Sequence, residues 1–326
     1  MTNITYLRLS RCSLIFLPTG FMKKDKSVYI SLALSTLKKN GFTEITPVEI
    51  NDGVNLIIHL APYPIAARIA TALSEEYPDT AYRIQERELQ VASHLQGRNV
   101  PVLLPSDLIN PGPYDIGGTW MTLWRFESRA QLPRPSPEEV VGLIDKLSNA
   151  MKDFPGELPS LGPWEWTCKS ADRLGNHKDE RVQALLGIFQ KVNTEMRVDK
   201  DLLIACHGDA NLGNLFPSNN GWIWMDFEDV SKMPPYWDLA SFICIPALFR
   251  GVQEPTLKYV IDRFENKSES RAFGLALIAR TLTSTLGNLD YALRGFCDLD
   301  FAIQELGLAE DFINQIDFLS GEDIIN

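Results

Sequence analysis

The hydrophobic periodicity of the chain changes once, close to Phe126. Before that residue, short runs rich in aliphatic and aromatic residues are separated by turn signals such as Asn51-Asp52-Gly53, a pattern that predicts β-strands. The strands are expected at residues 42–50, 53–61, 64–70 and 119–126. Helical spacing is found at residues 27–39 and 82–95. An antiparallel sheet with one helix packed on it makes a small α+β lobe.

After Phe126 the apolar residues follow the helical period. Pro133, Pro135 and Pro137 mark a connector, and Ser136–Glu139 is a capping box with proline at the first helical position. The expected helices cover residues 138–152, 179–197, 237–249, 256–264 and 271–286, with further segments to about residue 318. One strand pair, formed by residues 202–206 and 222–227, is expected to interrupt them. A mostly β lobe is therefore followed by a mostly helical lobe.

The composition is that of an ordinary globular protein, with 45% hydrophobic and 22% charged residues among 326. Because 42 acidic residues face 31 basic ones and the net charge is −11, neither a nucleic-acid partner nor an anionic membrane surface is expected. Five scattered cysteines without a C-x-x-C pair are typical of reduced thiols. No apolar stretch approaches the ~18 residues that a transmembrane helix needs. These features predict a cytoplasmic protein.

One segment holds polar residues in a fixed order. His207-Gly208-Asp209 is followed after four further residues by Asn214, and the triplet Asp226-Phe227-Glu228 comes next. Protein kinases have an H-R-D-x-x-x-x-N loop followed by D-F-G, with the same spacing from Asp to Asn. A single Asp-Phe or His-Gly-Asp sequence is common in surface turns, but the three linked elements together indicate a phosphoryl-transfer site.

With Trp237-Asp238-Leu239-Ala240 further on, this segment resembles the aminoglycoside phosphotransferase and choline kinase family, whose hallmark is H-G-D-x-x-x-x-N, a later D-F-E or D-F-D, and W-D-L-A. The strong match covers residues 207–240. The resemblance implies an α+β, bilobal protein-kinase-like fold, with a small antiparallel-sheet N-lobe carrying one helix and a larger, mainly helical C-lobe. Residues 1–26 are interpreted as a leader, disordered or foreign to the fold, residues 27–127 as the nucleotide-binding N-lobe, and residues 128–326 as the catalytic and substrate-binding C-lobe.

Phosphoryl transfer requires positioning and charge neutralisation, with a carboxylate near the attacking hydroxyl. Asp209 is the candidate catalytic base, which would accept the hydroxyl proton or orient the hydroxyl. Mg²⁺ prefers oxygen ligands, and Asp226 and Asn214 would supply one charged and one neutral ligand to a single cation. His207 is expected to orient the loop by hydrogen bonding. Asp238 is expected to cap a helix or to brace the loop backbone.

The N-lobe assignments follow from the resemblance. Arg68 stands where these enzymes place a Lys or Arg against the α- and β-phosphates, and Glu88 on the following helix is the candidate to pair with it. Glu86 competes for that pairing. Gly53 and Asn55 resemble the short turn that contacts phosphate in this family.

The nucleotide base is expected to meet the end of the strand at residues 119–126. Arg125, Phe126 and Glu127 would offer their backbone N–H and C=O groups as a hinge. ATP is the expected nucleotide, with Mg²⁺ as the metal. GTP stays open, because the G-x-G-x-x-G loop of protein kinases is absent from the sequence.

These residues favour an ATP-dependent phosphotransferase that moves the γ-phosphate to a hydroxyl of a small molecule, such as an amino alcohol, a sugar or an aminoglycoside. Acidic residues could form a cleft for a cationic substrate, whereas solvated acidic faces are the plainer interpretation at this net charge. The acids concerned are Glu228, Asp229, Asp262, Asp290, Asp298 and Asp300. The alternative function is a catalytically silent, kinase-like protein that binds a nucleotide or metabolite. The substrate and the oligomeric state are not determined by the sequence.

Overall fold

The computed structural model describes residues 25–52, 55–71, 74, 78–197, 200–296 and 298–320. The chain divides into two compact units. The first combines Met1–Leu132 with Leu215–Glu228, and the second combines Pro133–Asn214 with Asp229–Asn326. The expected boundaries of the leader and of the two lobes stay a prediction, and only the last two residues of the leader are among the described ones.

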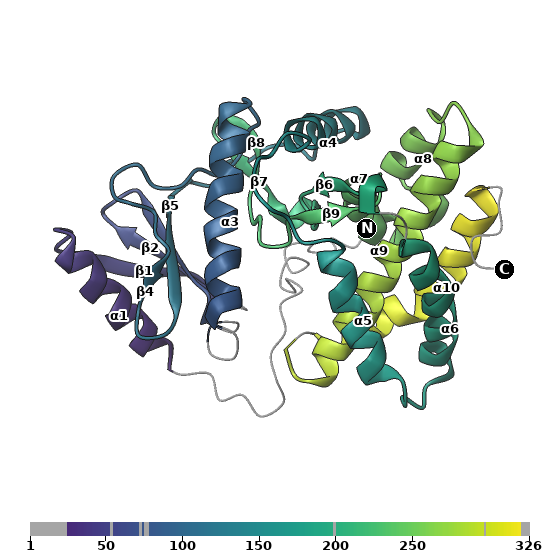
Figure 1. The fold of residues 1–326 in the computed structure, drawn as a ribbon, viewed down its shortest axis with the longest axis horizontal. Helices are drawn as coiled ribbons and strands as arrows, with labels where there is room; N and C mark the ends of the chain where they lie inside the picture. The colour runs from purple at the N-terminus through teal and green to yellow at the C-terminus, as the bar shows by residue number, and fades with distance from the viewer. Residues whose placement is uncertain are drawn as a thin grey trace. The chain divides into compact units, whose positions relative to one another are not determined.

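The first unit is built around a five-stranded antiparallel sheet (Figure 1). Its elements are α1 (Lys26–Lys39), β1 (Thr46–Asp52), β2 (Leu56–Ala61), β3 (Ile65–Ile69), α3 (Pro78–Gly97), β4 (Tyr114–Asp115), β5 (Trp120–Arg125), β7 (Leu215–Ser218) and β8 (Gly221–Trp224). The strand order in the sheet is β1-β2-β3-β5-β4. A separate hairpin is formed by β7 and β8. Backbone hydrogen bonds join Trp224 of this hairpin to Pro101 and Leu103, which ties residues 215–228 into the first unit.

The helices α1 and α3 lie on opposite sides of the sheet (Figure 1). Tyr29, Ala33 and Leu37 of α1 are buried against alternate strand residues, among them Ala67 of β3. Because successive side chains of a strand point to opposite faces, the next residue, Arg68, faces away from α1 and toward α3. The alternation along β3 therefore places one charged side chain opposite the apolar core of the unit.

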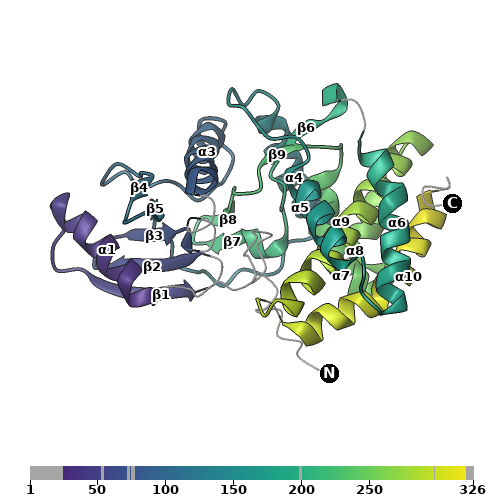
Figure 2. The same ribbon diagram turned by 60° about the horizontal axis from the view of Figure 1, so that its bottom comes forward.

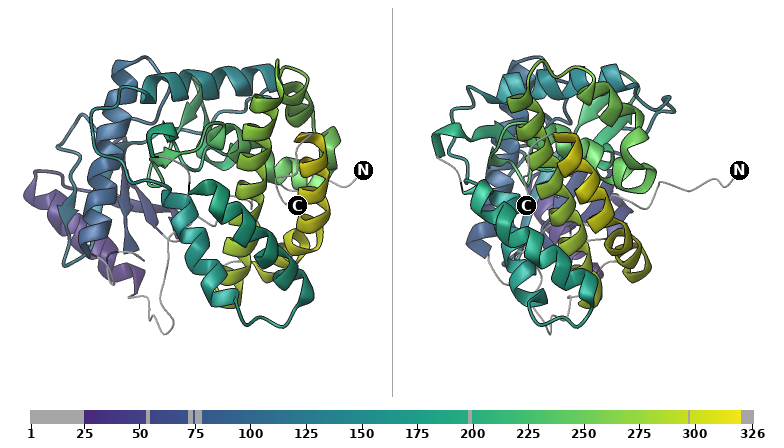
Figure 3. Two further views of the ribbon diagram at one scale, coloured as in Figure 1. Left: turned by 45° about the vertical axis from the view of Figure 1, so that its right-hand side comes forward. Right: turned by 90° about the vertical axis from the view of Figure 1, so that its right-hand side faces the viewer.

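The second unit is mainly helical (Figures 2 and 3). Its elements are α4 (Pro137–Met151), α5 (Gly162–Leu174), α6 (Glu180–Met196), η2 (Lys200–Leu202), β6 (Ile204–Cys206), η3 (Leu212–Asn214), β9 (Ser231–Met233), α7 (Trp237–Arg250), η4 (Gly251–Gln253), α8 (Pro255–Ile261), α9 (Lys267–Leu293) and α10 (Leu299–Ser320). The long helix α9 packs against α5, α6, α7 and α10, and its central part is buried. Among the described residues, no helix is long and apolar enough to cross a membrane.

The expected helix signals are confirmed where capping residues set the boundaries. The hydroxyl of Ser136 accepts the backbone N–H of Glu139 at 3.2 Å, and the carboxylate of Glu139 accepts the backbone N–H of Ser136 at 2.8 Å, so the capping box opens α4. Asn40 ends α1, and Gly41 follows it with a φ of +87°. Such local hydrogen bonds need no distant partner, and the sequence therefore shows them directly.

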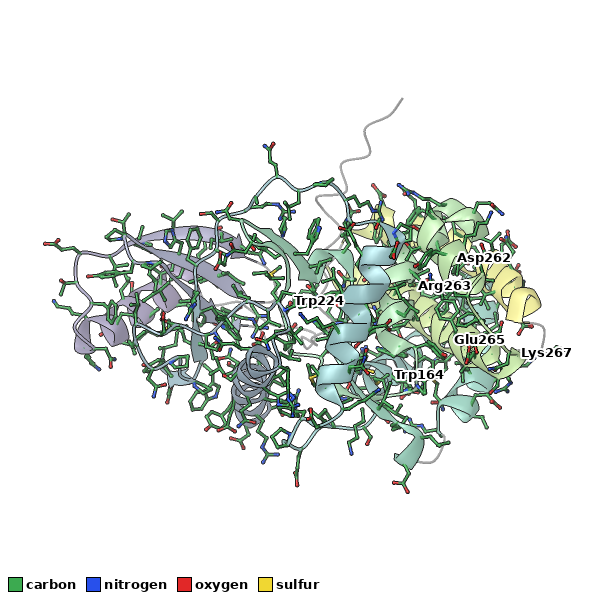
Figure 4. The ribbon with its side chains drawn as sticks, turned by 90° about the horizontal axis from the view of Figure 1, so that it is seen from above. Trp164, Trp224, Asp262, Arg263, Glu265 and Lys267 are labelled. Carbon is green, nitrogen blue, oxygen red and sulfur yellow. The ribbon has the colours of Figure 1, made fainter. Side chains whose placement is uncertain are left out.

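The helix α5 is missing from the sequence-based prediction. Its buried face includes Thr167 and Ser170, whose hydroxyls donate to Thr283 and Asp290 of α9 at 2.9 and 3.1 Å. Trp164, which is fully buried, completes this face (Figure 4). Because much of the buried face is small and polar, the helix has no continuous apolar period that would mark it.

The expected pairing of residues 202–206 with 222–227 is wrong. The strand β6 pairs with β9, and β8 pairs with β7. The strand β9 has three residues and is followed by Pro234-Pro235, while β7 contains Pro217. Short runs that contain or adjoin proline give little strand signal, so both true partners were overlooked.

A carboxylate lies fully buried between α9 and α10. Glu305 of α10 accepts hydrogen bonds from the Ser284 hydroxyl at 2.8 Å and from the Asn288 side-chain amide at 2.6 Å. Desolvation raises the pKa of Glu305 to about 7, although these two hydrogen bonds and the charge of Arg280 act in the opposite direction. The folded protein therefore binds a proton at Glu305 more tightly than the unfolded chain does.

We expect Glu305 to reduce stability as the pH rises. Its folded pKa of about 7 lies above the ordinary value of 4.5, so its contribution to stability is complete below pH 4.5 and is lost as the pH passes 7. Glu305→Gln stays neutral, and its unfolding free energy should exceed that of the wild type by about 1–3 kcal/mol near pH 8 but differ little near pH 4. Urea unfolding at both pH values measures this difference. Glu310→Gln, at an exposed position of α10, is the control, and an equal pH dependence in Glu305→Gln and the wild type would contradict the prediction.

Candidate functional site

In the second unit, the side chain of Asp209 is held by three donors, two from its own loop, His207–Asn214, and one from α9. Its Oδ2 accepts hydrogen bonds from the side-chain amides of Asn211 at 2.8 Å and Asn214 at 3.0 Å. Its Oδ1 accepts a hydrogen bond from Arg280 at 2.9 Å. The side chain of Asp209 is 13% exposed, so the carboxylate is fixed on both oxygens and still reaches solvent.

Asp238 braces this loop from the first turn of α7. One of its oxygens accepts the backbone N–H of His207 at 2.8 Å, and the other accepts that of Gly208 at 3.0 Å. The residue at the helix cap is Tyr236, which makes no side-chain cap bond, so bracing is the contact that the structure shows for Asp238. Desolvation raises the pKa of Asp238, while the charge of His207 and the two backbone hydrogen bonds lower it.

Gly208 allows the backbone to turn closely beneath this brace. Its φ of +90° lies in the left-handed region, and a Cβ at this position would overlap the backbone carbonyl oxygen of Asp229. The carbonyl oxygen of Gly208 accepts the indole N–H of Trp237 at 2.8 Å. The preceding residue, His207, is fully buried, and its Nδ1 lies 3.4 Å from the backbone nitrogen of Asp209. These contacts fix the backbone conformation of the loop between β6 and Asp209.

Arg280 of α9 is the site residue that the sequence analysis missed. It is 6% exposed, forms the ion pair with Asp209, and places its guanidinium 5.4 Å from the ring centre of Trp237. A signal was present in the sequence, because Arg280 is the one charged residue between Phe273 and Leu286. A lone charge in an otherwise apolar, buried helix is rarely kept without a partner.

In the first unit, Arg68 lies at the centre of a buried group of carboxylates. From β3 it donates to Glu88 of α3 at 2.8 Å and to Asp226 at 3.3 Å, and it also donates to Glu228. The structure thus brings Arg68 and Glu88 together. Glu86, the other candidate for the pair, accepts a hydrogen bond from a tyrosine of α3 instead.

Three carboxylates lie around the guanidinium of Arg68, and a second guanidinium, that of Arg87, donates to the backbone oxygen of Glu228 at 3.0 Å. Desolvation raises the pKa of Glu88, and the charge of Asp226 adds to this effect, while the charge of Arg68 lowers it. Desolvation also lowers the pKa of Arg68, but the three carboxylates outweigh this effect and raise the pKa above its ordinary value. Of the three carboxylates, Asp226 is the most exposed, with 25% of its side chain accessible, and a carboxylate oxygen is a ligand that a hard cation prefers.

Asn214 and Asp226, the expected metal ligands, each have the chemistry of a ligand within their own unit. The amide nitrogen of Asn214 donates to the backbone oxygen and Oδ2 of Asp209 at 2.9 and 3.0 Å, so its amide oxygen is the atom that would meet a cation. Asp226 has a φ of +65°, in the left-handed region that residues other than glycine seldom adopt, and its carboxylate oxygens are ligands that a hard cation prefers. Both residues therefore fit a hard cation, while their convergence on one ion stays a prediction.

Of the turn expected to contact phosphate, Gly53 lies outside the described residues. Asn55 is buried, and its side-chain amide donates to Glu228 at 3.2 Å. This contact joins Asn55 to the carboxylates around Arg68. Its contact with a nucleotide stays a prediction.

The expected hinge residues follow directly along β5 and beyond it. The backbone N–H groups of Arg125 and Phe126 donate to backbone carbonyls of the same unit at 2.9 and 3.0 Å. The ring of Phe126 stacks on His59, with 3.7 Å between the ring centres. Two of the expected hinge donors are therefore already used within the unit, and contacts of Arg125, Phe126 and Glu127 with a nucleotide base stay a prediction.

The acids considered for a cationic substrate have local partners or are scattered. Asp290 is buried and accepts a hydrogen bond from Arg173 at 2.9 Å. Asp298 accepts backbone N–H groups at the start of α10. Asp262 lies in the exposed, mixed-charge connection between α8 and α9 (Figure 4). These positions favour the structural interpretation of the three residues.

Comparison with known proteins gives one family and a shared fold. Residues 75–273 match the model described as the phosphotransferase enzyme family (APH). No curated protein matches the chain.

Three solved structures resemble most of the chain. Amicoumacin kinase hAmiN in complex with AMP-PNP, Ca²⁺ and Ami is 13% identical, with a TM-score of 0.63 over 93% of this chain and 99% of its own. The ethanolamine kinase of Plasmodium vivax is 13% identical, with a TM-score of 0.61 over 91% and 92%. The GDP complex of aminoglycoside 2'-phosphotransferase-IIIa is 14% identical, with a TM-score of 0.60 over 90% and 99%. The prediction of a protein-kinase-like fold, with an antiparallel sheet and a mainly helical part, is confirmed.

We expect Asp238→Asn to loosen the loop that presents Asp209. Both oxygens of Asp238 accept N–H groups, and an asparagine side chain would direct its own NH₂ group at one of them. The resulting unsatisfied buried groups should lower the unfolding free energy by about 2–4 kcal/mol, measured by urea unfolding. The exposed Asp262→Asn is the matched control and should change little. An Asp238→Asn variant as stable as the wild type would show that the brace is not needed.

Proposed function

Because the chain belongs to the phosphotransferase enzyme family, we propose that it transfers the γ-phosphate of ATP to a hydroxyl group of a small molecule. The observation that carries this proposal is the geometry of Asp209, a carboxylate held on both oxygens at the motif position of the catalytic base. A fixed carboxylate suits phosphoryl transfer, whose loose transition state requires positioning and only late removal of the proton.

In the proposed reaction the acceptor hydroxyl donates a hydrogen bond to Asp209. A carboxylate has about four acceptor positions, and three are used by Asn211, Asn214 and Arg280. The fourth would hold the hydroxyl so that its oxygen can attack the γ-phosphorus in line. As the new O–P bond forms and the bond to the bridging oxygen of ADP breaks, the hydroxyl proton passes to Asp209.

Mg²⁺ is the proposed metal, with Asn214 and Asp226 as its ligands. When bound, it would neutralise charge on the phosphate oxygens of the nucleotide. The exposure of Asp226, the most accessible of the three carboxylates around Arg68, supports a cation at this residue. Arg68, held by Glu88, is the proposed contact of the α- and β-phosphates.

The nucleotide and the acceptor are proposed by class. Of the similar structures described above, one was solved with AMP-PNP and another with GDP, which supports a nucleotide as phosphate donor, with ATP as the proposed one and GTP as the alternative. An ethanolamine kinase and an aminoglycoside phosphotransferase are among them, so an amino alcohol, a sugar or an aminoglycoside is the proposed acceptor.

We expect Mg²⁺-dependent release of ADP with at least one member of a panel of amino alcohols, sugars and aminoglycosides. Asp209→Asn keeps the size of the side chain but removes the base, and should lower turnover by about 100-fold or more. A coupled assay of ADP release measures this change, with Asp262→Asn as the active control. If nucleotide binds but no acceptor supports turnover, the catalytically silent alternative is favoured. Unchanged turnover in Asp209→Asn would exclude Asp209 as the base.

We expect Mg²⁺ to strengthen the binding of a nucleotide analogue through Asp226. At about 100 times its Kd, a ligand of the folded state adds about 2.7 kcal/mol of stability, so Mg²⁺ with AMP-PNP should raise the Tm more than AMP-PNP alone. Asp226→Asn should lose the part of the shift that depends on Mg²⁺, because a neutral amide is a weaker ligand. Thermal unfolding with and without EDTA measures the shift. An equal Mg²⁺ effect in both proteins would exclude Asp226 as a ligand.

A further inference from the structure

Arg280 is a buried cation to which the proposed reaction gives no direct part. We infer that Arg280 is the positioning residue of the catalytic base: from α9 it holds the carboxylate of Asp209 in the orientation that receives the acceptor hydroxyl. The inference rests on the proposed function, since Asp209 acts as a base only within it.

The contacts of Arg280 are poor for a residue that serves stability alone. Its Nη2 donates to Asp209, whereas its Nε and Nη1 are buried without a hydrogen-bond partner among the described residues. The remaining contact is the face of the Trp237 ring. Burying a guanidinium with one hydrogen bond costs free energy, and an apolar side chain of similar size often serves a protein core better. The effect of Arg280 on Asp209 is therefore the better reason for an arginine at this place.

The geometry shows what that effect is. The amides of Asn211 and Asn214 both donate to Oδ2 of Asp209, and in the described part of the second unit Oδ1 has Arg280 as its donor. With Oδ2 alone held, the carboxylate could turn about its last side-chain bond. Arg280 also fixes Oδ1, so the remaining acceptor position of the carboxylate points in a fixed direction.

Arg280 also offsets negative charge in this part of the second unit. Its charge acts on two further buried carboxylates, Asp238 and Glu305, as well as on Asp209. Lysine at position 280 would keep the charge and offer a donor, but it lacks the planar group that packs on Trp237. Methionine has a comparable length without charge or donor. These two substitutions therefore separate the charge of Arg280 from its packing.

The first measurement asks whether the contact exists and needs no activity. Arg280→Met, Asp209→Asn and the double variant are compared by thermal unfolding. We expect Arg280→Met to lower the Tm by at least about 3 °C, because it leaves the charge of Asp209 without its partner. Adding Asp209→Asn should restore most of this loss, since the charge is then gone. Additive Tm shifts would overturn the inference.

The second measurement asks whether the contact acts on the reaction. With an acceptor found in the panel, the kcat of Arg280→Met, per folded protein, should fall by about 100-fold, while the KM for ATP changes by less than about threefold. Arg280→Lys should recover a large part of kcat. Arg271→Gln, near the start of α9, removes an ion pair with Glu195 of α6 and should leave kcat unchanged.

The outcomes separate the inference from the proposed function. A normal kcat in Arg280→Met, or a loss that appears in KM for ATP instead, would overturn the positioning of Asp209 while leaving the proposed function intact. If the wild type turned over no acceptor, the proposed function would fail. Coupled Tm shifts would then still support the contact between Arg280 and Asp209.

Discussion

Asp238 accepts two consecutive backbone N–H groups, those of His207 and Gly208, and the candidate base depends on this contact. A carboxylate has an acceptor for each amide, whereas a neutral side chain of the same size would leave one of them unsatisfied. The contact works because Gly208 has no Cβ to meet the chain at Asp229. The side chain of Asp209 then projects from the loop in a fixed direction. The spacing of the motif is therefore required first by the backbone hydrogen bonds that hold the loop.

The two units treat their buried charges differently. In the second unit, the carboxylate of Asp209 has a permanent counterion, Arg280. In the first, Arg68 faces three carboxylates at once, and the charge of Arg87 also acts on one of them, Glu88. A fixed partner suits the proposed role of Asp209 as the base, because the orientation of a base must not change from one cycle to the next. The proposed cation, which would arrive with the nucleotide, would bind at Asp226, the most exposed of these carboxylates.

The sequence predicted those features whose partners lie close together in the chain. The capping box at Ser136 and the loop from His207 to Asn214 are fixed by contacts over a few residues, and both could be seen in the order of residue types. The contact of Arg68 with Glu88 required the resemblance to a family. The helix α5 was not predicted because Thr167 and Ser170, whose hydroxyls bond to α9, interrupt the apolar residues of its buried face. Here polar burial replaced the pattern that sequence reasoning uses.

Arg280 shows where this reasoning ends and why. A lone arginine in an apolar helix predicts a buried acidic partner, but the sequence offers several acids and no means of choosing among them. In the structure, the number of hydrogen-bond donors that each buried acid already has identifies the partner of Arg280. Asp238 has two backbone amides, Glu305 has a hydroxyl and an amide, and Asp209 has donors from its own loop on one oxygen only. The guanidinium of Arg280 donates to Oδ1 of Asp209, the oxygen that has no donor from the loop, although the two residues are 71 positions apart in the chain. The same comparison of donors explains why an arginine so far from the motif can hold the carboxylate of Asp209, the proposed base, in one orientation.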